Sequence, residues 1–116
     1  MAPTATSKID GLHELRGDEG SVLVLELKRP RLDEGLLDDL ETAMAAIDRA
    51  AGRAEIAGLI LRAHRKGLPD GPAPETLLDC SDLESLTRFA ERGAEIARRL
   101  ERLPVPVVAL LRGRCL

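Results

Sequence analysis

The chain has 116 residues, of which 44% are apolar and 32% charged, and its formal net charge is −3. This length suits one domain, and its core must be aliphatic because Phe89 is the single aromatic residue. The acidic balance and the scarcity of rings argue against a nucleic-acid partner and against a polybasic membrane contact.

The sequence also lacks the signals of export and of metal binding. Residues 1–8 hold no apolar stretch of the kind that a secretory signal needs. The longest apolar run, 105–111, is too short to cross a bilayer. Two cysteines, Cys80 and Cys115, are too few and too far apart for a disulfide scaffold or a zinc site. We therefore expect a cytoplasmic protein without a metal.

The N-terminal half predicts strands and one helix. Residues 1–20 are polar and glycine-rich, and we expect a flexible segment with a short edge strand around residues 9–15. Valine and leucine residues predict a half-buried strand over 21–28. Over 34–51 apolar residues recur every three or four positions, which predicts a helix with Gly52 as its C-cap.

The C-terminal half predicts two further strands and a second helix. A continuous apolar run over 56–63 is typical of a strand that is buried on both faces. Residues 64–75 hold glycines and prolines and predict a loop without regular structure. A helix then runs from Ser81 to about Leu103, and a buried strand follows over 105–111. We expect the buried side of this helix to consist of Leu83, Leu86, Phe89, Ala90, Ala94, Ile96, Ala97 and Leu100.

The order of these elements predicts an α/β fold with a largely parallel sheet and right-handed crossovers. Ligand sites of such sheets lie at the carboxyl ends of the strands. We therefore expect residues 77–83 and 112–116 to face a common site. The sequence stops just after the last strand, so we interpret the chain as truncated, with its apolar edge over 105–111 exposed when the chain is isolated.

The start of the second helix is a candidate anion or oxyanion site, because free backbone N–H groups point outward there. The residues alone leave a simpler alternative open. In that alternative Asp79, Ser81 or Asp82 only caps the helix.

Three segments, in this order, resemble the N-terminal part of the crotonase superfamily, the enoyl-CoA hydratases and isomerases. Residues 25–33 (LELKRPRLD) resemble the strand and asparagine-arginine-proline turn that open these proteins. Residues 77–83 stand where the family has a phenylalanine-x-alanine-glycine-alanine-aspartate-leucine motif. Residues 100–116 (LERLPVPVVALLRGRCL) are the most similar segment and match a helix end and a strand before a glycine-rich turn.

The resemblance implies the N-terminal β-α-β units of a crotonase-like (ClpP/crotonase) spiral, with residues 21–116 as a partial domain. It implies an acyl-CoA substrate whose adenine lies along the backbone of Arg31, Leu32 and Asp33. The backbone N–H of Ser81 then donates to the thioester oxygen, as half of an oxyanion hole. The substrate-binding residues implied in this way are Arg31, Leu32, Asp33, Asp79, Cys80, Ser81 and Asp82.

The family reaction is hydration or isomerisation of the acyl-CoA through an enolate, with no cofactor besides the coenzyme A of the substrate. The resemblance places the second oxyanion donor and the acid and base residues beyond Leu116. We therefore expect an inactive chain, and the intact family protein to be a trimer or hexamer.

The sequence departs from the family pattern at several of these positions. Cys80 stands where the family has glycine, which allows close approach of a ligand to the backbone. Asp79 replaces an alanine, Leu77 an aromatic residue and Asp33 an asparagine. The Asp33 carboxylate repels the phosphates of coenzyme A unless Arg29 or Arg31 offsets it.

A regulatory module offers an alternative of another class. Small domains of the anti-sigma-antagonist (STAS) type have about this length and bind a kinase through a serine at the start of a helix. Residues 79–83 (DCSDL) faintly resemble that site. In that family the serine directly follows a strand, whereas a long loop precedes Ser81 here.

Overall fold

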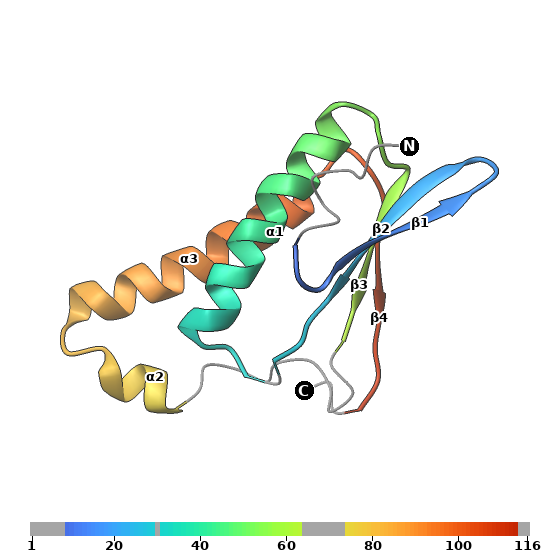
Figure 1. The fold of residues 1–116 in the computed structure, drawn as a ribbon. Helices are drawn as coiled ribbons and strands as arrows, with labels where there is room; N and C mark the ends of the chain where they lie inside the picture. The colour runs from blue at the N-terminus through green and yellow to red at the C-terminus, as the bar shows by residue number, and fades with distance from the viewer. Residues whose placement is uncertain (1–8, 30, 64–73, 114–116) are drawn as a thin grey trace.

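A sheet with helices on one of its faces forms the fold in the computed structural model, which describes residues 9–29, 31–63 and 74–113 (Figure 1). Its elements in chain order are β1 (Leu12–Gly17), β2 (Gly20–Glu26), α1 (Glu34–Gly52), β3 (Gly58–Arg62), α2 (Pro74–Asp79), α3 (Leu83–Glu101) and β4 (Val107–Leu110). No helix of this described part is long and apolar enough to span a membrane.

The sheet confirms the predicted α/β class. Its strand order is β1-β2-β3-β4, and β2, β3 and β4 run parallel. Strand β1 pairs with β2 in an antiparallel hairpin. The edge strand expected around residues 9–15 is therefore present, shifted to Leu12–Gly17, and Leu12 is buried. Residues 1–8 of the expected N-terminal segment lie outside the described residues.

Helix α1 covers the sheet and contributes the centre of the core. Leu37, Met44 and Ile47 are almost fully buried, at spacings of seven and three along the helix. They meet Leu23 and Leu59 from the two central strands. The periodicity that predicts this helix from the sequence thus corresponds to the face that packs on the sheet.

The C-terminal end of α1 differs from the prediction. Gly52 is the last helical residue, Arg53 is the C-cap, and Ala54 takes a left-handed conformation with φ 55°. The Glu55 N–H donates to the Ala50 carbonyl at 2.9 Å, which closes the turn. A β-carbon makes this backbone conformation cost about 1 kcal/mol, so sequence signals favour glycine there.

Helix α3 begins and ends close to the predicted residues, but its predicted buried side was too wide. Within this helix Phe89 and Ile96 are buried, whereas Leu83 is 77% exposed and Leu86 39% exposed. Helix α3 lies against α1, and its N-terminal half extends past α1 (Figure 1). An apolar residue there has no second layer to pack on.

The predicted burial of the last two strands was also wrong. The helices cover one face of the sheet (Figure 1), so Ile60 on β3 is only half-buried. Strand β4 lies at the end of the strand order and is exposed along its whole length, with Val108 54% exposed. This agrees with the expectation that the isolated chain exposes an apolar edge.

A short helix replaces part of the predicted loop. Residues 64–73 lie outside the described residues, but Pro74 and Glu75 begin α2. Proline is common at the first position of a helix, because its missing N–H has no partner there in any case.

Two sets of ion pairs connect α1 with α3 at matching positions. Arg92 donates to Glu41 and Asp38, and Arg99 donates to Asp48 at 2.6 and 2.8 Å. Glu41 and Asp48 are seven residues apart, as are Arg92 and Arg99, so the two helices run parallel. The hydrogen bonds from Arg92 lower the pKa of Glu41 below its ordinary value and raise that of Arg92.

Because α1 contributes the centre of the core, shortening one of its buried side chains is expected to destabilise the fold strongly. Ile47→Ala is expected to lower the free energy of unfolding by about 2–5 kcal/mol, because it leaves a cavity. The control Leu78→Ala removes a side chain that is 84% exposed and is expected to cost less than about 0.5 kcal/mol. Urea unfolding followed by circular dichroism measures both, and equal losses would contradict the packing.

The lowered pKa of Glu41 predicts a pH dependence with a defined sign. A carboxylate whose pKa is lower in the folded state stabilises the fold above its unfolded pKa, and this stabilisation is lost as the pH falls. The wild-type chain should therefore lose about 0.5–1 kcal/mol more than Glu41→Gln between about pH 6 and pH 3, a small value because the pair is partly exposed.

The matched control for this experiment is Glu95→Gln. Glu95 accepts only from Arg98 on its own helix in the described contacts. Its removal should leave the pH dependence close to that of the wild type. If the pH dependence of stability of Glu41→Gln matched that of Glu95→Gln, the ion pair between Glu41 and Arg92 would contribute nothing to the stability of the fold.

Candidate functional site

A cavity of about 560 Å³ lies among the first turns of α1 and α3 and the short helix α2. Its lining residues are Asp33, Glu34, Gly35, Thr76, Asp79, Cys80, Ser85, Arg88, Phe89 and Arg92. The lining thus contains Asp33 and the pair Asp79 and Cys80, which belong to the two separate segments that the sequence selected. The structure brings these two segments to one cavity.

The other predicted site residues are not among those that line this cavity. Leu32 is half-buried and packs against the core. Arg31 pairs with Glu75 of α2, with 3.6 Å between guanidinium and carboxylate. Ser81 is exposed and is not a lining residue. Segment 31–33 thus reaches the cavity through Asp33.

Asp82 caps helix α3, as the simpler alternative to an anion site predicted. Its carboxylate accepts from the Ser85 N–H at 2.7 Å, and its backbone is extended, as an N-cap requires. This backbone hydrogen bond lowers the pKa of Asp82 below its ordinary value. The capping role of Asp82 leaves Ser81 outside the helix, as an exposed residue that directly follows Cys80 of the cavity lining.

Cys80 stands where the motif that residues 77–83 resemble has a glycine. Cys80 follows α2, is half-buried and packs against the core. Its backbone N–H donates to the Leu77 carbonyl at 3.2 Å. That donor is engaged in the last turn of α2, so Ser81 offers the next N–H along the chain.

Several lining residues were missed by the sequence analysis. Ser85, Arg88, Phe89 and Arg92 all come from the first turns of α3. The last three lie three, four and seven residues along from Ser85, which places all of them on one helical face, a signal that was present in the sequence. The sequence did not indicate that this face borders a cavity, because the position of α2 is a tertiary feature.

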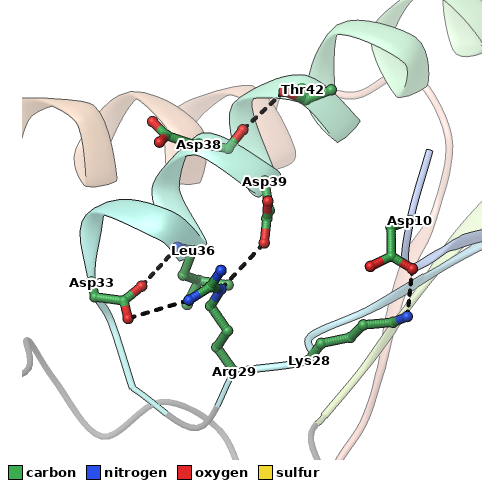
Figure 2. A network of polar contacts seen from close by, with 8 residues as sticks. All are labelled: Asp10, Lys28, Arg29, Asp33, Leu36, Asp38, Asp39 and Thr42. Carbon is green, nitrogen blue, oxygen red and sulfur yellow. Dashed lines mark hydrogen bonds and ion pairs between the residues drawn. The ribbon is translucent and has the colours of Figure 1, made fainter.

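The beginning of α1 is fixed by a polar network around Arg29 (Figure 2). Asp33 accepts from the Leu36 N–H at 2.8 Å and so caps the helix. The Arg29 guanidinium lies 3.7 Å from the Asp33 carboxylate and 3.4 Å from that of Asp39. Arg29 therefore connects the residues after β2 to the first two turns of α1 and offsets the charge of Asp33.

A second contact holds the same stretch of chain from its other side. Lys28 donates to the Asp10 carboxylate, just before β1 (Figure 2). This hydrogen bond lowers the pKa of Asp10 and raises that of Lys28. The residues that precede the candidate segment 31–33 are thus tied to both the sheet hairpin and α1.

The carboxyl ends of β3 and β4 meet as predicted. The Ala63 N–H donates to the Leu110 carbonyl at 2.9 Å, and Arg112 donates to the Ala63 carbonyl at 3.1 Å. Residues 114–116 lie outside the described residues. Among the described residues that line the cavity are residues 33 and 79–80 but not Arg112 or Gly113.

The described residues offer little for metal chemistry. Among them, no group of three or more histidine, cysteine, aspartate or glutamate side chains is arranged to hold a metal ion. The cavity is instead polar and carries charges of both signs, with Phe89 as its one aromatic lining residue.

Comparison with solved structures identifies the fold. An enoyl-CoA hydratase from Mycobacterium smegmatis matches 85% of this chain with a TM-score of 0.71 and 24% identity. One from Bacillus halodurans matches 90% with a TM-score of 0.65 and 25% identity, and one from Shewanella pealeana matches 93% with a TM-score of 0.67 and 17% identity. These matches cover 38%, 43% and 41% of the respective neighbours.

No protein-family model matches the sequence, and no curated protein is detectably similar to it. The solved structures nevertheless agree in their description, since another of them, from Legionella pneumophila, is described as an enoyl-CoA hydratase/isomerase (crotonase). The chain therefore has the α/β fold of a part of the enoyl-CoA hydratase (crotonase) structures, as its sequence segments predicted.

Proposed function

We propose that this chain forms the coenzyme A side of a site that acts on acyl-CoA thioesters, by hydration or isomerisation through an enolate. The observation that carries the proposal is the cavity of about 560 Å³. Its lining includes Asp33, Asp79 and Cys80, which belong to the two segments, 25–33 and 77–83, that resemble crotonase segments. The similarity to enoyl-CoA hydratase structures supports the same substrate class.

In this proposal the backbone of Arg31, Leu32 and Asp33 lies along the adenine of coenzyme A. The backbone N–H of Ser81, an exposed residue, donates to the thioester oxygen. A donor fixed at the position where negative charge develops stabilises the enolate more than the ground state, and this difference accelerates the reaction. We assign no acid or base to a described residue.

The remaining features of the proposal rest on the resemblance. We propose that the chain by itself is inactive, because it spans about 40% of the length of the enzymes that it matches. An intact protein of this kind would act in the cytoplasm as a homo-oligomer, a trimer or hexamer.

The regulatory-module alternative receives no support from the comparisons. The structure also places Ser81 after a helix, α2, whereas the phosphorylated serine of the anti-sigma-antagonist type directly follows a strand. We therefore retain the acyl-CoA proposal alone.

The first prediction is binding without turnover. The 116-residue chain should bind coenzyme A in isothermal titration calorimetry and should not hydrate crotonyl-CoA, measured by the loss of enoyl absorbance. Absence of coenzyme A binding would overturn the proposed site. Measurable turnover would overturn the proposal that the chain alone is inactive, and would support its substrate class.

The second prediction concerns the Ser81 donor. Ser81→Pro removes the backbone N–H, whereas Ser81→Ala keeps it and serves as the matched control. We expect the proline variant to bind acetyl-CoA about three- to tenfold more weakly, the contribution of one hydrogen bond, and to bind free coenzyme A like the wild type.

The alanine variant should bind both ligands like the wild type. An equal loss for acetyl-CoA in the two variants would assign the effect to the hydroxyl group and contradict the backbone donor. Circular dichroism of both variants checks that α3 remains folded.

A further inference from the structure

We infer that Arg29 and Gly35 are positioning residues for the proposed coenzyme A segment. They form what we call the Arg29 latch: the Arg29 guanidinium, the backbone of Gly35 and the carboxylates of Asp33 and Asp39. The inference deepens the proposed function, since the residues that the latch orients, 31–33, are the proposed contact to coenzyme A.

The contact between Arg29 and Gly35 is unusually close. A β-carbon on Gly35 would lie 2.8 Å from the guanidinium carbon of Arg29 and 2.9 and 3.0 Å from its two terminal nitrogens. The guanidinium therefore occupies the space that any other side chain at position 35 would need. Glycine at this position therefore leaves room for the guanidinium to lie against the helix backbone.

The latch connects two parts of the chain on either side of the candidate segment. Arg29 follows β2, whereas Asp33 and Asp39 belong to the cap and second turn of α1 (Figure 2). Residues 31–33 lie between these anchors. With both ends held, their backbone is ordered before a ligand arrives, which lowers the entropy that binding must overcome.

The latch is separable from the fold itself. The atoms that a β-carbon would meet are the far end of a flexible side chain, so Arg29 can move aside at little cost. Its ion pairs are half-exposed, with 48% of the Arg29 side chain accessible, and such pairs contribute little to stability. Gly35→Ala should therefore displace Arg29 and leave the chain folded.

A second helical glycine provides the matched control. Gly93 lies in α3, and a β-carbon there would meet no atom within 4 Å. Gly93→Ala and Gly35→Ala make the same chemical change in a helix, and alanine favours a helix over glycine. The methyl group added at Gly35 displaces a guanidinium and borders the cavity, whereas the one added at Gly93 does neither. Arg29→Gln changes the guanidinium without adding a group at Gly35 and so separates these two effects.

The experiment measures local order and ligand affinity on the full 116-residue chain. In Gly35→Ala and Arg29→Gln, we expect the Leu36 and Leu37 amides to exchange with solvent about three- to tenfold faster, measured by NMR. These amides donate to the Asp33 side chain and carbonyl. We expect the affinity for coenzyme A to fall about three- to tenfold in both variants, with the melting temperature of Gly35→Ala at or above that of the wild type.

Gly93→Ala should change neither the exchange of Leu36 and Leu37 nor the affinity. If Gly35→Ala matches Gly93→Ala in both measurements, the latch is overturned. If exchange accelerates while the affinity for coenzyme A is unchanged, Arg29 orders α1 but does not position the ligand segment, and the inference fails. If the wild-type chain binds no coenzyme A, the proposed function fails. The ordering role of the latch is tested separately by amide exchange, and it is overturned if exchange is unchanged in Gly35→Ala.

Discussion

The packing of α1 on the parallel strands is the interaction on which the other elements depend. Met44 and Ile47 are completely buried between this helix and the sheet. Helix α3 reaches the core through Phe89 and Ile96 and lies against α1. Because the sheet has helices on one face, the loss of α1 would expose the apolar side of both its neighbours.

The packing of α3 against α1 also explains where the candidate cavity lies. The ion pairs of Arg92 and Arg99 set α1 and α3 parallel and in matching positions along their lengths. Parallel helices begin at the same end, so the caps at Asp33 and Asp82 lie at the same end of the helical layer. Two segments that are about fifty residues apart in sequence thereby contribute to one cavity.

The polar contacts of the segment between β2 and α1 order this segment more than they stabilise the fold. The pairs of Arg29, Lys28 and Arg31 all involve exposed or half-exposed side chains, whose net contribution to folding is small. They nevertheless restrain the chain between β2 and α1 from several directions. A short connecting segment that is held in this way can present its backbone to a ligand without a large entropic cost.

The sequence alone determined the α/β class, the order of the strands and of the two long helices, and the extent of these helices, because periodicity and proline positions depend on local geometry. It also selected Asp33, Asp79 and Cys80, through the resemblance of short segments. Only the tertiary structure decided which apolar residues are buried: Leu83 and Val108 have the composition of a core but no layer to pack against. It also decided that Ser85 and Arg88 border the cavity, since this depends on how α2 and α3 lie relative to α1, which no local pattern encodes.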